Sequence, residues 1–120
     1  TREKIEALSI KTEGPNQTVL QLSGGNQQKV VFAKALMSRP KVLLCDEPTQ
    51  AVDVKTRAEI HKLLRRLADA GSAVVFVSSD LKEVLEATAN VQVMAGGRTK
   101  ERFVNDGLTA EQVLACCYAN

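Results

Sequence analysis

Residues 22–53 read LSGGNQQKVVFAKALMSRPKVLLCDEPTQAVD, and this stretch decides the fold of the chain. Two glycines after Ser23 open a helical pattern, and an apolar strand pattern beginning at Lys41 then ends on the acidic pair Asp46-Glu47. The first turn of a helix offers free backbone N–H groups to anions. Carboxylates at the end of a parallel strand lie where open α/β sheets bind ligands. The stretch therefore suits a site that handles phosphate and a metal ion.

Two helical patterns flank that strand. Ser23 suits the N-cap of the first, which is apolar from Val30 to Met37 apart from Lys34, so we expect it to be buried on most sides. Asp53 suits the N-cap of the second helix. That helix carries an apolar stripe at helical spacing and ends at Gly71; the stripe consists of Ile60, Leu63, Leu64 and Leu67. The strand between them, residues 41–46, lacks polar alternation, which predicts a parallel strand covered on both faces.

The remaining patterns complete an α/β order. They predict a second strand at 73–77, a helix capped by an acidic box from Asp80, a hairpin turning at Gly96-Gly97, and a last helix capped at Thr109 with Val113 and Leu114 inward. Ahead of the glycine turn we expect a short helix at 3–8, with Ile5 and Leu8 inward, and a loop at 11–21. Strand, helix, strand, helix, hairpin and helix predict an α/β fold with a mainly parallel sheet.

Composition narrows the class of protein. Sixteen Lys and Arg against fourteen Asp and Glu give a net charge of +2 with the signs interspersed, so no basic patch points to nucleic acid. Three cysteines without ligand or disulfide spacing indicate a reducing compartment, and Cys45 reads as core. No apolar run approaches the ~20 residues that span a bilayer. We expect a soluble, cytoplasmic polypeptide.

In this order and spacing, the motifs resemble those of the ATP-binding cassette family. Residues 22–28 look like its signature motif, residues 42–47 like its Walker B strand with the catalytic glutamate, and residues 51–53 like its D-loop. The likeness continues along nearly the whole chain. Within the family it is most similar to the second cassette of fused two-cassette ATPases that drive ribose, xylose and galactose importers, because of the NQQKV run at 26–30 and the VDV at 52–54.

The resemblance implies roles for individual residues. Glu47 would polarise the attacking water and Asp46 would hold Mg²⁺ at the site of the same cassette. The signature residues would instead reach the γ-phosphate of ATP held by a partner cassette. The nucleotide-binding set is Ser23, Gly24, Gly25, Gln27, Asp53 and Ser79. Taken singly, an acidic pair also suits a solvated strand end, and two glycines also suit a plain tight turn.

The phosphate loop of that family is absent from these 120 residues, which contain no G-x-x-x-x-G-K-[S/T]. The resemblance therefore implies a C-terminal portion of one nucleotide-binding domain: the end of the helical subdomain with the signature helix at 1–38, and the Walker B half of a RecA-like P-loop NTPase core at 39–120. We expect the isolated chain to be inactive as an ATPase, because it lacks the main grip on the β- and γ-phosphates.

Ser79 stands where the family usually has a histidine that contacts the γ-phosphate, and this leaves two functions open. The first is an ATPase subunit that couples ATP and Mg²⁺ to uptake of a small solute, a sugar. It implies a second cassette, transmembrane permease subunits and, indirectly, a periplasmic or extracellular solute-binding protein as partners, at the inner face of the cell membrane. The alternative is a hydrolysis-deficient regulatory or scaffold half. A cassette of DNA repair or translation is disfavoured, because the chain has no basic patch.

Overall fold

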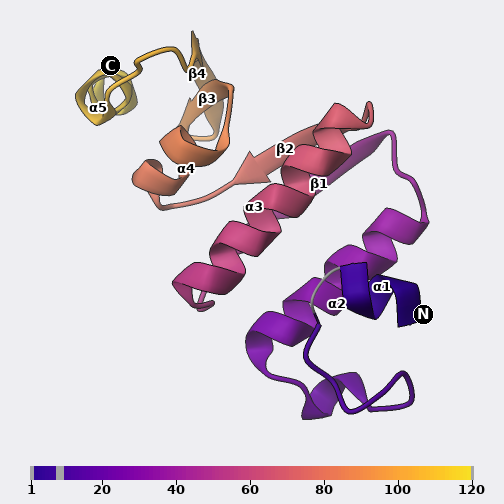
Figure 1. Ribbon diagram of the computed structural model, residues 1–120. Helices are drawn as coiled ribbons and strands as arrows, with labels where there is room; N and C mark the ends of the chain where they lie inside the picture. Colours follow the sequence, from indigo (N-terminus) through magenta and orange to yellow (C-terminus); the bar gives the residue numbers. More distant parts are fainter. Residues whose placement is uncertain (1, 8–9, 120) are drawn as a thin grey trace. The chain divides into compact units, whose positions relative to one another are not determined.

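The computed structural model describes residues 2–7 and 10–119, and the contacts divide the chain into two compact units, residues 1–75 and 76–120 (Figure 1). The first unit contains α1 (Arg2–Ala7), η1 (Val19–Gln21), α2 (Gly24–Met37), β1 (Val42–Asp46), α3 (Val54–Asp69) and the start of β2 (Ala73–Val77). The second contains α4 (Leu81–Ala87), β3 (Asn90–Ala95), β4 (Arg98–Val104) and α5 (Ala110–Tyr118). The predicted α/β order is confirmed.

Helix α2 packs mainly against α3 and the short helix η1, which lies within the segment expected to be a loop. Its buried residues are Lys29, Phe32 and Ala33. Val31 and Met37 are 60% and 69% exposed, so the expectation of burial on most sides is wrong. The physical reason is that α3 and η1 cover only part of its circumference. The α1 helix confirms the expectation at 3–8, except that Leu8 lies outside the described residues.

Helix α3 is fixed at both ends by its sequence. Its four predicted stripe residues are all buried, and Ile60 has no exposed surface. At the C-terminus, Gly71 adopts a left-handed φ of 102°, its N–H donates to Ala68 O at 3.0 Å, and Ser72 N–H donates to Leu67 O at 3.0 Å. These two bonds satisfy carbonyls that a helix end leaves free. The predicted stop at Gly71 is confirmed.

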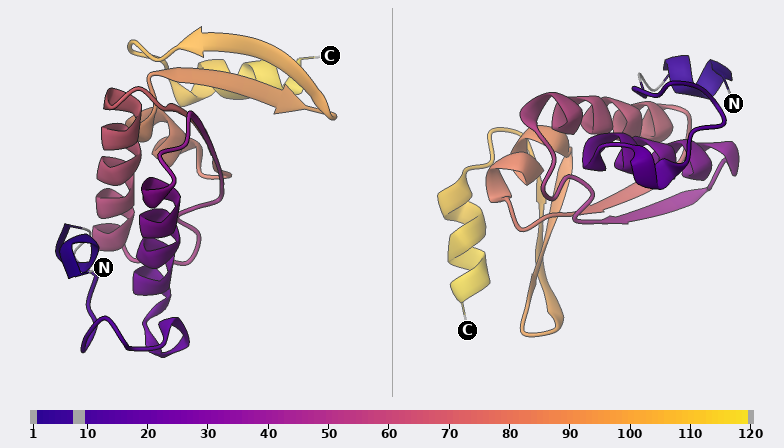
Figure 2. Two further views of the ribbon diagram at one scale, coloured as in Figure 1. Left: turned by 90° about the vertical axis from the view of Figure 1, so that its right-hand side faces the viewer. Right: turned by 90° about the horizontal axis from the view of Figure 1, so that it is seen from below.

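Strands β1 and β2 pair in a two-stranded parallel sheet, joined by α3. Cys45 of β1 is buried, and burial raises the pKa of its thiol. Val42 and Leu44, whose side chains alternate with that of Cys45, are exposed, so the prediction that this strand is covered on both faces is wrong. Figure 2 shows α2 and α3 on the same side of β1, which explains why only one face is covered within residues 10–75.

The second unit is a hairpin covered by helices. Gly96 and Gly97 have φ values of 58° and 72°, which is the backbone of the predicted two-residue turn, and α5 packs on β3. Thr109 makes the predicted capping box with Gln112. Val113 is 4% exposed as expected, but Leu114 is 44% exposed, so its inward position is wrong. Neighbouring residues on a helix point about 100° apart, and the face that contacts β3 is the one carrying Val113.

Candidate functional site

The glycine turn opens α2 with its first residues at the surface. Ser23 is the N-cap, and its Oγ accepts from the backbone N–H of Asn26 at 3.4 Å and from Asn26 Nδ2 at 2.9 Å. The Asn26 side chain in turn accepts from Lys11 N–H at 3.0 Å, which ties the preceding loop to this turn. A Cβ added at Gly24 would meet nothing within 4 Å. The backbone at Gly24 is therefore open to close approach by a ligand.

Gly25 faces the first turn of α3 instead. A Cβ there would lie 3.0 Å from both Cγ2 and Oγ1 of Thr56. Thr56 is held by the α3 cap: its N–H donates to Asp53 Oδ1 at 2.9 Å and its hydroxyl to Asp53 Oδ2 at 2.8 Å. These hydrogen bonds, the backbone one first, hold the pKa of Asp53 below its usual value. The structure thus brings the predicted signature residues and the predicted D-loop aspartate to adjoining helix starts.

The acidic pair leaves β1 in two different backbone states. Asp46 is the last residue of the strand and is exposed, whereas Glu47 is half-buried with a left-handed φ of 45°. A left-handed conformation is uncommon for a residue with a Cβ. The chain turns here, because Gln50 N–H donates to Glu47 O at 3.2 Å, and the turn residues Pro48 and Thr49 are buried. The two acidic residues therefore differ in exposure and in backbone conformation.

Two contacts that the sequence patterns did not predict join these parts. Gln28 Nε2 donates to Pro48 O at 2.8 Å, across twenty residues of sequence. Lys29 of α2 makes an ion pair with Glu59 of α3, with side chains 6% and 27% exposed. The only sign of this ion pair in the sequence is Lys29 itself, a charged residue directly before an apolar run. Gln27, predicted to bind nucleotide, has its side-chain amide directed to Leu22 O at 3.0 Å.

Ser79 is the only one of the eight predicted site residues that belongs to the second unit; the other seven lie in the first. It is exposed, just after β2. Next to it, the Ser78 hydroxyl donates to Glu83 Oε2 at 2.7 Å and accepts from Asp80 N–H at 3.1 Å. The Asp80 side chain caps α4 through Glu83 N–H at 3.2 Å, which confirms the N-cap of the predicted acidic box. Ser79 therefore sits at the start of an ordered turn.

Residues 2–7 and 10–119 contain no group of three or more His, Cys, Asp or Glu side chains that could hold a metal ion. Mg²⁺ at phosphate sites needs no such cage, because it takes one or two carboxylates and completes its shell with phosphate oxygens and water. Asp46, an exposed carboxylate at a strand end, fits that requirement.

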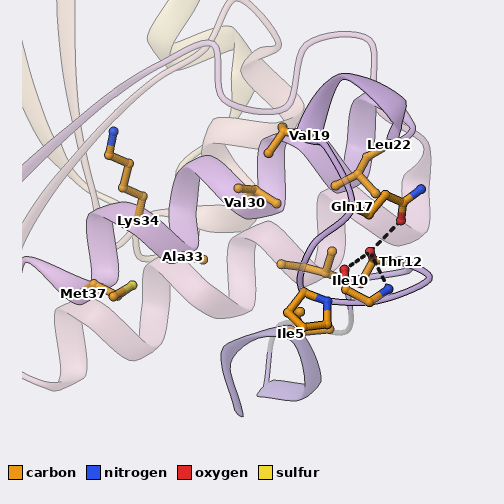
Figure 3. A pocket seen from close by; sticks show the side chains of 12 residues that line it. Ile5, Ile10, Thr12, Gln17, Val19, Leu22, Val30, Ala33, Lys34 and Met37 are labelled. Carbon is orange, nitrogen blue, oxygen red and sulfur yellow. Dashed lines mark hydrogen bonds between the residues drawn. The ribbon is translucent and has the colours of Figure 1, made fainter. Parts of the chain in front are cut away.

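An apolar pocket of about 200 Å³ lies elsewhere in the first unit, between α1, the loop after it and α2 (Figure 3). Its polar members include Thr12, whose hydroxyl donates to Gln17 Oε1 at 2.6 Å. Val30, Ala33 and Met37 contribute the α2 side of the pocket. None of the eight predicted site residues is among those lining it, so the pocket is separate from the predicted phosphate and metal site.

Known proteins share both the sequence and the arrangement. Residues 1–50 match the family model described as ABC transporter. The chain is 50% identical over 112 residues, 93% of its length, to the xylose import ATP-binding protein XylG of Pseudomonas fluorescens strain Pf0-1, and 43% identical over 112 residues to XylG of Escherichia coli K12. Over nearly its whole length, this chain is similar to ATP-binding proteins of the ABC transporter family. It spans 22% of the length of each of these two relatives.

Solved structures show the same likeness. The dimeric, post-hydrolysis state of the ATP-binding cassette MJ0796, bound to ADP and Pi, superimposes with a TM-score of 0.74 at 30% identity, covering 89% of this chain and 46% of that one. A second dimeric structure of MJ0796, described as a bacterial ABC transporter cassette, matches equally well. The predicted P-loop NTPase fold class is thereby confirmed. The division at residue 38 into subdomain and core stays a prediction.

Proposed function

We propose that this ABC chain is part of the ATP-binding subunit of an importer, which couples binding and hydrolysis of ATP to uptake of a small solute, a sugar. The relatives named as xylose import proteins support a sugar as the solute class. The observation that carries the proposal is the packing of the glycine turn, the strand end and the capped start of α3 into one unit. Its two tie points are the Gly25–Thr56 contact and the Gln28–Pro48 hydrogen bond.

In this proposal Glu47 is the general base of its own cassette. Its half-buried carboxylate accepts a proton from the water that attacks the γ-phosphate. Asp46, exposed beside it, holds Mg²⁺, which when bound neutralises charge on the β- and γ-phosphates. The phosphate loop that grips those phosphates is not part of these 120 residues. For that reason we also propose that the isolated chain does not turn over ATP.

Ser23, Gly24 and Gly25 serve the other nucleotide, the one held by a partner cassette. The exposed hydroxyl of Ser23 and the open backbone at Gly24 suit contact with an anion that arrives from outside the chain. Gln27 and Asp53 support the same surface, at the starts of α2 and α3. The dimeric form of the similar cassette MJ0796 supports a pairing of two cassettes.

The remaining partners follow from the importer class. We propose that the subunit sits in the cytoplasm, peripherally on the inner face of the membrane, bound to transmembrane permease subunits and served indirectly by a periplasmic or extracellular solute-binding protein. No helix that the structure describes, within 2–7 and 10–119, is long and apolar enough to cross a bilayer.

Ser79 favours a second candidate, a regulatory or scaffold half. A serine can hydrogen-bond a phosphate but has neither the reach nor the titratable ring of histidine. In that version the cassette binds nucleotide, hydrolyses it poorly, and contributes mainly its glycine turn to the partner.

The two candidates separate in the full-length subunit assembled with its permease in vesicles. Uptake of labelled xylose, ribose and galactose is measured with ATP for the parent protein, Glu47→Gln and Ser23→Arg. Loss of uptake in both variants supports the ATPase subunit, and loss in Ser23→Arg alone supports the scaffold half. Full uptake in both variants would refute the roles assigned to this chain.

A further inference from the structure

A glutamine on the second turn of α2 touches the turn that follows β1. Gln28 is half-buried, and its Nε2 donates to the backbone carbonyl of Pro48 at 2.8 Å. We propose that Gln28 is a positioning residue, which holds Glu47 in its working conformation and keeps it in register with the glycine turn. The inference rests on the proposed function, since it assigns a role toward the carboxylate of that same site.

The turn after β1 combines left-handed backbone with two long backbone hydrogen bonds, so a short bond from outside the turn adds restraint. Glu47 and Ala51 both have left-handed φ values, 45° and 58°, which residues with a Cβ rarely adopt. The backbone bonds within the turn are Gln50 N–H to Glu47 O at 3.2 Å and Val52 N–H to Thr49 O at 3.4 Å. The bond from Gln28 is shorter than both. It fixes the carbonyl of Pro48, in the second peptide unit after Glu47, and so restrains the turn that carries the carboxylate.

The donor itself stands on a fixed part of α2. The next residue, Lys29, is buried in its ion pair with Glu59 of α3. One turn earlier, Gly25 packs against Thr56. Helix α3 therefore anchors α2 both before and after Gln28. If the turn after β1 moves, the amide of Gln28 has little freedom to follow it.

This placement links the two half-sites. Ser23 caps α2, Gly24 and Gly25 lie in its first turn, and Gln28 lies in the second. A rigid rise of about 1.5 Å per residue therefore separates the surface for the partner's ATP from the hydrogen bond to Pro48. A displacement of the glycine turn on binding the partner's nucleotide pulls directly on Pro48. Without the Gln28–Pro48 hydrogen bond, the glycine turn and the turn after β1 are both still present, but their relative position is no longer fixed.

The test measures steady-state ATP turnover of the full-length subunit with three substitutions. Gln28→Met keeps the volume and loses the donor, while Gln28→Lys keeps an N–H donor. Gln92→Met is the matched control, because Gln92 also donates to a backbone carbonyl, Glu101 O at 3.0 Å, within the hairpin. We expect Gln28→Met to lower kcat about tenfold or more with KM for ATP within about twofold, because small misplacements of a catalytic group cost rate rather than affinity. Gln28→Lys recovers most of kcat, and Gln92→Met matches the parent.

The rate of backbone amide hydrogen exchange at residues 47–52 in the nucleotide-free protein provides a second measurement, which does not depend on ATP turnover. Gln28→Met should speed exchange there and Gln92→Met should not. An active parent whose kcat and exchange are unchanged by Gln28→Met overturns the inference alone, as does an equal loss in Gln28→Met and Gln28→Lys. A parent without ATP turnover overturns the proposed function instead, and the exchange result then decides whether Gln28 holds the turn.

Discussion

Gly25 and Thr56 meet where α2 and α3 begin, and a Cβ on Gly25 would lie 3.0 Å from two atoms of the threonine side chain. Thr56 has little room to withdraw, because it is 8% exposed and its hydroxyl is bonded to Asp53 Oδ2 at 2.8 Å. Gly24, directly before, faces open space. Two adjacent glycines therefore meet different requirements: Gly25 permits the packing of two helix starts, and Gly24 leaves backbone accessible.

Gly25→Ala should destabilise the fold. Alanine favours a helix over glycine, but the new methyl must displace a buried, bonded threonine, and overpacking of this kind costs about 1–2 kcal/mol. The measurement is the free energy of unfolding from urea titration of the chain.

Gly24→Ala is the matched control for that experiment. Its methyl meets nothing within 4 Å, so the free energy of unfolding should stay within about 0.5 kcal/mol of the parent. In the full-length subunit the same methyl should lower ATP turnover, because it stands where the partner's nucleotide approaches. Equal stability of the two variants would contradict the packing role of Gly25.

Local features of this fold were readable from the sequence because they depend on a few neighbouring residues. Asp53 and Thr109 cap the helices that their patterns predicted, and Gly71 ends α3 through its left-handed backbone. The turn at Gly96-Gly97 forms as its two glycines require. Each cap and turn depends on the backbone conformation of three or four neighbouring residues, and the identity of those residues decides it.

Burial was less readable, because it depends on what packs against each face. The apolar patterns predict that α2 is buried on most sides and that β1 is covered on both faces, yet Val31 and Leu44 are exposed. An apolar pattern indicates which faces of a helix or strand are hydrophobic, but not whether other parts of these 120 residues pack against those faces. The ties across the site were missed for a similar reason: the partners in Gln28–Pro48 and Lys29–Glu59 are 20 and 30 positions apart, and no local pattern pairs them.

Asp53 should make the fold sensitive to acid. Hydrogen bonds from Thr56 lower its pKa in the folded state, so its contribution to stability is fully present above the unfolded value of about 3.9 and is lost as the pH falls through the folded value. Asp53→Asn keeps an acceptor for the cap but does not titrate. The urea midpoint of the parent should fall more between pH 6 and pH 3 than that of Asp53→Asn. Parallel curves for the two proteins would contradict this assignment.

The ion pair of Lys29 and Glu59 should couple α2 to α3. Lys29 is buried, and removal of Glu59 leaves its charge poorly solvated. A double-mutant cycle with Lys29→Met and Glu59→Gln should give a coupling energy of about 1–3 kcal/mol in the free energy of unfolding. The surface pair Lys82–Glu86, at 3.9 Å with both side chains exposed, is the control and should give close to zero. Similar coupling energies in the two pairs would contradict the anchoring role.

We propose that residues 22–53 serve two different nucleotides, with Ser23 acting on the partner's and Glu47 on that of its own cassette. In the full-length subunit, substitution of the phosphate-loop lysine of the partner cassette inactivates that site, so that only the site containing Glu47 binds ATP. Binding of a fluorescent ATP analogue is then titrated for Ser23 and for Ser23→Arg. We expect the same Kd for both proteins, because Ser23 does not touch that nucleotide. A Kd weakened about tenfold or more by Ser23→Arg, the scale of one lost charge-assisted phosphate contact, would contradict it.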